Sequence, residues 1–190
     1  MGQITFFLVR HGEAENNVNH IGNSLPEKRK MHLTEAGVKQ VRTTAAFLAK
    51  QGVQVIIASP LHRTRETATL IAEQTGVEVL IDDRLHETGL GIYNDGPIDK
   101  FFAKYPDIRM RLSPDALDGT ESIIDMRGRI EGFLHDVKQV YLNKKVVIVS
   151  HGDVLDQMYG ILTHESPGQT FDDNWYPDKG SCMEVVWEIE

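Results

Sequence analysis

The stretch ITFFLVRHGEAENN (Ile4–Asn17) decides the fold class, because a nearly continuous apolar run leads directly into an arginine, a histidine and a glycine. Short apolar runs rich in β-branched and aromatic side chains are typical of strands that are buried on both faces. β-Branched runs recur at residues 53–58, 77–81 and 146–149. We therefore expect these four runs to be strands of a mostly parallel sheet.

Amphipathic stretches with helix-start signals lie between the predicted strands. Thr34 is a candidate N-cap for one helix, and Ser59-Pro60 is interpreted as the N-cap and first residue of a second. Ser122 is a candidate N-cap for a long helix, and a short helix is expected after Gly152. Strands that alternate with helices predict a parallel sheet with helices on both faces.

The C-terminal run MEVVWEIE (residues 183–190) alternates apolar and acidic side chains, which is typical of a half-exposed edge strand. Charged and proline-containing segments interrupt the strand–helix alternation at residues 22–32 and at about residues 93–120; the second is expected to contain a short helix near residues 98–105. The sequence thus predicts an α/β fold, a three-layer α/β/α sandwich with a mostly parallel central sheet and one antiparallel edge strand. We expect a single domain over residues 1–190, with a lid-like excursion at about residues 93–120.

Composition narrows the possible partners without naming a function. A formal net charge of −8 disfavours a nucleic acid or an anionic membrane, since both require a broad basic surface. Cys182 is the single cysteine and has no partner for an internal disulfide, and no apolar run is long enough for a membrane span or a signal peptide. We expect a cytoplasmic protein.

Polar and ionisable residues follow every one of the four predicted parallel strands. They form the groups Arg10-His11-Gly12, Ser59 to Arg63, Leu85-His86-Glu87 and Ser150-His151-Gly152. Because ligands of parallel α/β sheets bind beyond the carboxyl ends of the strands, we expect these groups to share one site.

The residue types at these strand ends suit phosphoryl transfer. Two guanidinium groups offer planar pairs of donors that match phosphoryl oxygens, and helix N-termini add backbone donors. A neutral imidazole is nucleophilic and leaves readily from phosphorus, and a protonated carboxyl group at the rim can protonate the departing oxygen. A glycine after each histidine is interpreted as letting backbone approach the ligand.

Taken together, the motifs resemble the histidine phosphatase superfamily in its phosphoglycerate mutase-like branch (branch 1). The resemblance spans nearly the whole chain in the family's order, and its main motifs here are LVRHGEAENN, SPLHRTRETA, LHETGLG and VSHGDVL. It implies that His11 is the nucleophile that becomes phosphohistidine, and that Glu87 is the general acid and later the base that activates water. It also implies that the reaction needs no metal and no cofactor.

The same resemblance implies a phosphate pocket around the nucleophile. Arg10, Arg63 and His151 match the pocket and count with His11 and Glu87 as the expected catalytic set, His151 donating to the transferring group. In addition to Arg10, Arg63 and His151, the expected substrate-binding residues are Asn17, which would contact the substrate phosphate, and Gly152.

Three positions depart from the family's habit. Ala14 stands where many members carry a serine or threonine, which removes one hydroxyl near the phosphate. Tyr93 replaces a frequent tryptophan in an irregular segment that ends at Gly96, so the geometry around Glu87 is less firmly predicted than that around His11. Asp153 adds a negative charge near the mouth of the pocket.

Three functions stay open at this point, with metal-independent phosphomonoester hydrolysis first. The alternative is a mutase, which returns the phosphoryl group to another hydroxyl; it needs a second anion site and exclusion of water. The basic residues between Tyr93 and Thr120 are offset by acidic ones, which favours the phosphatase. A non-catalytic phosphate-binding protein is the third reading. The expected partner is a small phosphorylated metabolite, with a homodimer as a further option.

Overall fold

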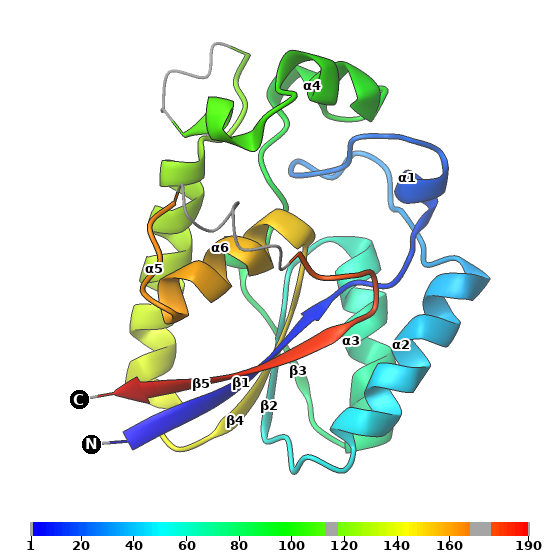
Figure 1. Ribbon diagram of the computed structural model, residues 1–190. Helices are drawn as coiled ribbons and strands as arrows, with labels where there is room; N and C mark the ends of the chain where they lie inside the picture. The colour runs from blue at the N-terminus through cyan, green and yellow to red at the C-terminus, as the bar shows by residue number, and fades with distance from the viewer. Residues whose placement is uncertain (1, 113–117, 168–175, 190) are drawn as a thin grey trace.

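The computed structural model describes residues 2–112, 118–167 and 176–189, whose core is one mixed sheet (Figure 1). The sheet has five strands in the order β3-β2-β4-β1-β5. The first four in this order are parallel, and β5 pairs antiparallel with β1. The strands are β1 (Gly2–Arg10), β2 (Val55–Ala58), β3 (Val79–Ile81), β4 (Lys145–Ser150) and β5 (Cys182–Ile189). The predicted fold class is confirmed, including the antiparallel edge strand.

Two pairs of helices cover the two faces of the sheet. The pair α2 (Glu35–Leu48) and α3 (His62–Thr75) lies on one face, and α5 (Ile123–Val140) and α6 (Gly152–Leu162) lie on the other (Figure 1).

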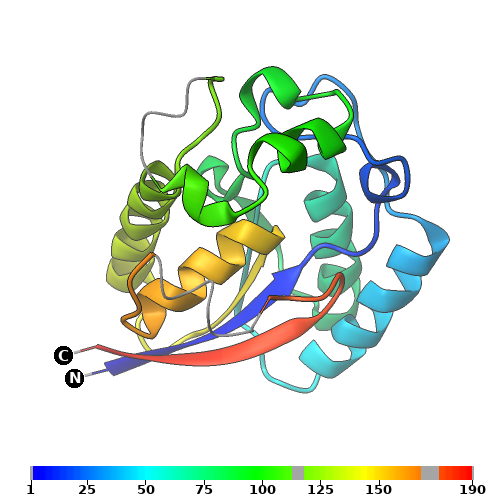
Figure 2. The same cartoon turned by 45° about the horizontal axis from the view of Figure 1, so that its top comes forward.

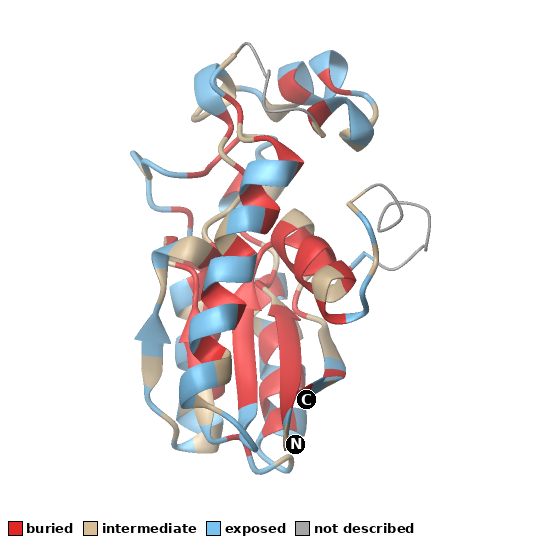
Figure 3. Cartoon of the chain, turned by 90° about the vertical axis from the view of Figure 1, so that its left-hand side faces the viewer, coloured by how far each residue is buried: buried red, intermediate tan, exposed pale blue. Residues whose placement is uncertain are grey.

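The alternation of side chains along β1 explains this arrangement. Phe6 and Leu8 pack in the cluster of α5 and α6, whereas Phe7 and Val9 pack in the cluster of α2 and α3. The central strands are therefore buried on both faces, as Figure 3 shows.

Two of the three predicted N-caps are confirmed, and one is wrong. The Thr34 hydroxyl accepts from the Gly37 N–H at 3.0 Å, and the Ser122 hydroxyl accepts from the Asp125 N–H at 3.0 Å. Ser59 does not cap α3, which begins at His62. The Ser59 hydroxyl is instead used in a contact to another strand end, 92 residues away in sequence.

The excursion beyond the sheet contains the expected short helix, α4 (Ile98–Lys104). Two 3₁₀ turns (Asp83–Leu85 and Gly91–Tyr93) precede α4, and a third (Ile108–Arg111) follows it. The apolar side chains of the excursion form a small separate cluster, made by Leu90, Phe101 and Tyr105 with Tyr93 and Ile98 packed against it. Figure 2 shows α4 beyond the end of β1, close to the segment of α1 (Glu15–Val18). The excursion thus lies over the edge at which the site was expected, and its residues 113–117 fall outside the described part.

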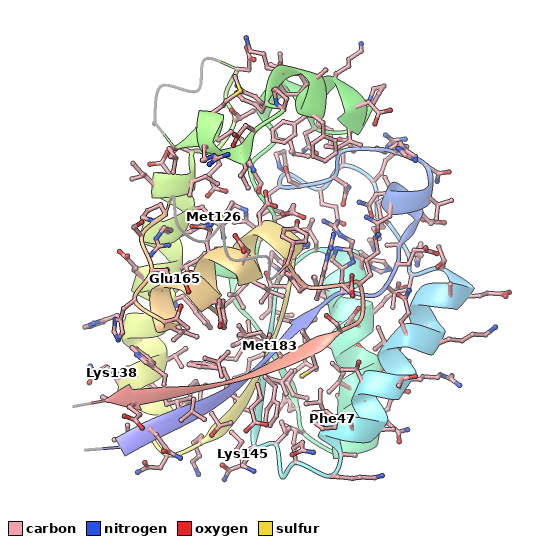
Figure 4. The ribbon with its side chains drawn as sticks, viewed as in Figure 1. Phe47, Met126, Lys138, Lys145, Glu165 and Met183 are labelled. Carbon is pink, nitrogen blue, oxygen red and sulfur yellow. The ribbon has the colours of Figure 1, made fainter. Side chains whose placement is uncertain are left out.

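The opposite edge of the sheet carries none of the expected site residues. Figure 4 labels Lys145, at the start of β4, and Phe47, near the end of α2; both lie at the edge farthest from α4. Within residues 2–112, 118–167 and 176–189, none of the helices combines the length and apolarity needed to cross a bilayer.

Candidate active site

Strand register brings three of the predicted groups to one level. Arg10 at the end of β1 is the register partner of Ser150 at the end of β4, and the His11 N–H donates to the Ser150 carbonyl at 3.1 Å. The Ser59 N–H after β2 donates to the Val149 carbonyl at 2.9 Å. The residues that leave β1, β2 and β4 therefore start side by side.

The segment that carries Glu87 returns to this centre from the edge strand β3. The Ser150 hydroxyl donates to the Leu85 carbonyl at 2.8 Å, which ties the segment to the end of β4. Farther along, the Gly89 N–H donates to the Glu121 carboxylate at 3.1 Å. Both sides of the Glu87 segment are thus bonded to neighbouring elements, and the carboxyl group is held over the strand ends.

Arg63 is the point at which the predicted groups meet. Its Nε–H donates to His11 Nε2 at 3.1 Å, and its Nη2 lies 3.1 Å from His151 Nδ1 and 3.7 Å from Glu87 Oε2. The Asn23 side-chain oxygen accepts from Nη1 at 2.5 Å, and the Asn23 carbonyl accepts from Nη2 at 3.1 Å. The guanidinium is only 1% exposed, and burial lowers the pKa of Arg63 to about 10, so it remains a cation at neutral pH.

The contacts of His11 leave Nε2 as its nucleophilic atom. Nδ1 lies 2.7 Å from the Gly12 carbonyl, which can only accept, so Nδ1 carries the proton. Burial, followed by the charges of Arg63 and Arg10, keeps the pKa of His11 well below its usual value. The imidazole is therefore neutral and has its lone pair on Nε2, the atom that accepts from Arg63.

His151 is neutral for the same physical reasons. A guanidinium can only donate, so His151 Nδ1 accepts from Arg63, and the proton lies on Nε2, 2.8 Å from the Ser59 hydroxyl. Burial and then the charge of Arg63 keep the pKa of His151 well below its usual value. Nδ1 also lies 3.5 Å from Glu87 Oε2, so this nitrogen faces the expected reaction centre.

Glu87 occurs in surroundings that favour its protonated form. Burial, followed by the charge of Asp153, raises the pKa of Glu87, although Arg63 and Arg10 oppose the shift. Asp153 accepts from the hydroxyls of Thr88 and Tyr176 at 3.0 and 2.9 Å. Burial opposes ionisation of Asp153, but the Arg111 guanidinium, whose Nη2 lies 2.8 Å away, outweighs burial and lowers the pKa of Asp153.

Arg10 and Asn17 line the same cavity as Arg63 and Glu87. Arg10 is oriented by donation to the Pro177 carbonyl at 2.8 Å, and its guanidinium lies 5.1 Å from the centre of the Tyr176 ring. The Asn17 side-chain oxygen accepts from the Ala14 N–H at 3.0 Å. This assigns the Asn17 NH₂ group as the part that can donate to a ligand.

The two glycines that follow the histidines have a role in protein packing. A Cβ on Gly12 would lie 2.6 Å from the Gly37 carbonyl of α2. A Cβ on Gly152 would collide with the Tyr176 hydroxyl. Both glycines thus permit close contact between separate parts of the chain, and the approach of a ligand to their backbone stays a prediction.

A cavity of about 300 Å³ is lined by Arg10, Asn17, Arg63 and Glu87. His11 and His151 are buried and are not among its described lining residues; both contact Arg63, which is. Apolar side chains form part of its outer wall, contributed by Ile21, Leu90, Ile98, Phe101 and Phe102. Phe101 is buried and packs within the excursion, whereas Phe102 is 58% exposed. Tyr93 packs against the excursion's own cluster, and its hydroxyl donates to Asp118 at 2.8 Å. Of the aromatic residues of the excursion, Phe101 and Phe102 are therefore the two that face the cavity.

Three groups that hold the site together were not predicted from the sequence: Asn23, the Ser59 hydroxyl and Arg111. Asn23 accepts a hydrogen bond from Arg63, and the Ser59 hydroxyl bonds to His151. Their local sequence does not predict partners so distant along the chain. Tyr176, in the C-terminal loop, also lies against the site, next to Arg10 and Gly152.

The chemistry of the cluster fits an anion better than a cation. The ligand atoms of His11, Glu87 and His151 lie within 4.8 Å of one another, a spacing that by itself suits a metal ion. The Arg63 cation, however, lies within 3.7 Å of all three groups. A metal ion placed among them would be repelled by that charge, whereas a phosphoryl group would be attracted by it.

Comparison with known proteins connects this geometry to a family. Residues 6–189 match the model of the histidine phosphatase superfamily (branch 1). Phosphoserine phosphatase 1 of Hydrogenobacter thermophilus is 34% identical over 164 residues, which cover 84% of this chain and 76% of that protein. A protein named probable phosphoglycerate mutase GpmB, from Serratia proteamaculans, is 34% identical over 153 residues, or 78% of this chain and 70% of the relative.

Solved structures show the same fold at lower sequence identity. A mycobacterial glucosyl-3-phosphoglycerate phosphatase superposes with a TM-score of 0.80 at 24% identity, covering 97% of this chain and 90% of that one. The Bacillus stearothermophilus protein YhfR superposes with a TM-score of 0.82 at 21% identity, covering 98% and 92%. These two likenesses concern the fold alone.

Proposed function

The chain belongs to the histidine phosphatase superfamily (branch 1) and is thus a phosphatase or a mutase, and we propose that it is a phosphomonoester hydrolase working through a phosphohistidine on His11. The observation that carries the proposal is the set of contacts made by Arg63. One buried cation touches the proposed nucleophile His11, the proposed acid Glu87 and the pocket residue His151. A phosphoryl group bound by this cation would lie against all three.

In the first half-reaction the phosphoryl group is transferred to the enzyme. Arg63 Nε turns from His11 Nε2 to a phosphoryl oxygen, which frees the lone pair to attack phosphorus. The N–P bond forms as the bond to the leaving oxygen breaks, and the Glu87 proton goes to that oxygen. Arg10 and the Asn17 amide donate to the remaining oxygens. The phosphate dianion raises the proton affinity of His151, so Nδ1 takes up a proton from solvent as the substrate binds and donates as well; this proton leaves when inorganic phosphate is released.

In the second half-reaction water takes the phosphoryl group. The Glu87 carboxylate accepts a proton from the water as its oxygen attacks phosphorus. The N–P bond then breaks and its electron pair returns to His11 Nε2, which yields inorganic phosphate and the starting enzyme. No metal or cofactor is required by these steps, because Arg63 and Arg10 supply the positive charge.

The lining of the cavity favours hydrolysis over mutase chemistry. A mutase must hold a second anionic group of the substrate near the reaction centre. Beyond Arg10 and Arg63, Lys179 is the one further lysine or arginine among the described lining residues, and it lies close enough to influence the charge of His11. The rest of the described lining is apolar or polar, with the acidic Asp153 in it, which suits a leaving group of little negative charge.

The proposal also covers the class of substrate, the binding partners and the cellular location of the protein. The substrate is a small phosphorylated metabolite, as the cavity of about 300 Å³ suits. A nucleic acid and a membrane are not partners in this account, since the net charge is −8. The proposal also includes a cytoplasmic location and assembly of the chain as a homodimer.

A panel of phosphomonoesters tests the proposal and separates its alternatives. We expect hydrolysis of an aryl phosphate and of one class of metabolite, unaffected by chelator and inhibited by vanadate. Each 3-phosphoglycerate reaction is run with and without a bisphosphoglycerate, and both free phosphate and 2-phosphoglycerate are measured. A strict requirement for a divalent metal, or isomerisation faster than phosphate release, would contradict the hydrolase assignment. No turnover of any ester together with tight phosphate binding would favour the non-catalytic reading.

A further inference from the structure

A second cluster of ligand-type side chains lies outside the cavity of the proposed reaction. It consists of His32, His62 and Glu66, which line a separate surface groove with Leu33 and Val38. His62 and Glu66 are one helical turn apart on α3, and His32 comes from the loop that precedes α2. None of the three has a role in the proposed phosphoryl transfer.

Three Lewis-basic atoms converge in this cluster. His32 Nδ1 lies 2.7 Å from Glu66 Oε1, and His62 Nε2 lies 3.2 Å from each of these two atoms. The two imidazole rings are nearly perpendicular, with an angle of 79° and centroids 4.4 Å apart. A single proton can be shared by only two of these three atoms in a hydrogen bond, whereas one metal cation can be coordinated by all three.

The size of the triangle matches the ligand spacing of zinc. A tetrahedral zinc ion with nitrogen and oxygen ligands at about 2.0–2.1 Å places those ligands about 3.3–3.4 Å apart. The edges of 2.7, 3.2 and 3.2 Å are close to that spacing. Only the shortest edge has to open, by about half an ångström, and His32 is free to adjust because its side chain is 55% exposed.

Surrounding hydrogen bonds already orient two of the three residues, Glu66 and His32. The other carboxylate oxygen of Glu66 accepts from the Leu33 N–H at 2.7 Å, which directs Oε1 to the cluster. His32 is anchored to Glu15 by two bonds, one from its N–H to the carboxylate at 3.0 Å and one from the Glu15 N–H to its carbonyl at 2.9 Å. Such supporting partners are what metal sites use to fix their ligands.

We infer that His32, His62 and Glu66 form a binding site for a divalent transition metal of the zinc type, with water completing the coordination. The site joins the loop before α2 to the first turn of α3, next to Arg63. The metal acts there as a clip between two segments and takes no part in phosphoryl transfer. Two imidazoles with one carboxylate suit zinc better than magnesium or calcium, which prefer oxygen ligands.

Calorimetric titration of the chelator-treated, desalted full chain with zinc chloride tests the inference. We expect one zinc ion to bind per chain, and thermal unfolding to shift upward by several degrees in its presence. His32→Ala and Glu66→Gln should each weaken binding at least tenfold and abolish the shift. The exposed α5 residue His135 provides the control: His135→Ala should bind zinc as the wild type does.

The possible outcomes separate clearly. Equal zinc affinity in wild type, His32→Ala and Glu66→Gln would place the metal elsewhere and overturn the inference, as would no saturable binding. Circular dichroism of each variant shows whether it is folded, and the exposure of His32 makes its loss tolerable. Aryl phosphatase activity should be the same with and without zinc, so the result is independent of the proposed function.

Discussion

At the scale of one residue, Arg63 shows how this site keeps a positive charge in a buried position. The guanidinium is buried, yet five partner atoms from His11, Asn23, His151 and Glu87 lie around it. A buried charge is tolerated only when it is paired and hydrogen-bonded, and this one is. Burial and then the charge of Arg63 keep the pKa of His11 well below its usual value, which favours the neutral state that a nucleophile needs.

The positions of the reacting residues were predictable from sequence, whereas their supports were not. Arg10, His11 and His151 lie at or directly after the ends of apolar strands, and Arg63 lies in the first turn of the helix that follows β2, so topology brings them together. Asn23 is different, because it lies in a loop and meets Arg63 only through tertiary packing. No periodicity marks a contact of that kind.

Replacing Glu87 with glutamine tests its assignment as the acid. Because the pKa of Glu87 is raised by burial and by Asp153, wild-type kcat for poor leaving groups should fall as pH rises through that pKa. Glu87→Gln should lose about 10²–10⁴ in kcat with alkyl phosphates and much less with an activated aryl phosphate. In Glu87→Gln, the fall of kcat for alkyl phosphates at high pH should also disappear. Steady-state pH profiles of both ester classes measure this.

The control for this variant is Glu73→Gln, on the exposed side of α3, which should behave as the wild type. An equal loss with alkyl and aryl esters in Glu87→Gln would count against proton donation.

Helix α6 shows at the scale of an element how burial changes the protonation of a carboxyl group. It begins at Gly152 directly beyond His151, and it buries Asp156, which is 3% exposed. Burial raises the pKa of Asp156 to about 7, although donation from the Gln157 side chain at 3.0 Å works in the opposite direction. The helix was predicted from sequence, but the burial of this carboxyl group was not, since Asp156 looks like an ordinary surface residue in the sequence.

We expect Asp156→Asn to change the pH dependence of stability. A carboxyl group whose pKa is higher in the folded than in the unfolded state stabilises the fold at low pH, and this contribution is lost as pH rises to the folded value of about 7. From pH 5 to pH 8 the wild type should therefore lose roughly 2 kcal/mol relative to the variant. Urea unfolding of both proteins at the two pH values gives this difference.

Asp99→Asn, on the exposed surface of α4, is the matched control and should show no such difference. A constant offset between wild type and Asp156→Asn across the pH range would refute the raised pKa of Asp156.

At the scale of the whole molecule, the sheet brings four separate sequence segments to one reactive edge. Apolar runs and helix starts were enough to predict the layers and the edge strand. The strand order β3-β2-β4-β1-β5 was not predictable in the same way, because it depends on which strands pair across long connections. That order places the ends of β1, β4 and β2 next to one another and so explains how an acidic chain of net charge −8 builds a cationic pocket.

The central claim is that the phosphoryl group passes through His11, and rapid-quench trapping tests it most directly. The enzyme is mixed with a ³²P-labelled substrate identified by the panel, denatured in alkali within the first turnover and digested for peptide mapping. We predict an acid-labile, alkali-stable phosphoryl group on the peptide that contains His11. It should be absent from His11→Ala and present in the exposed control His135→Ala. Labelling that persists in His11→Ala, or turnover by that variant at the wild-type rate, would contradict the account.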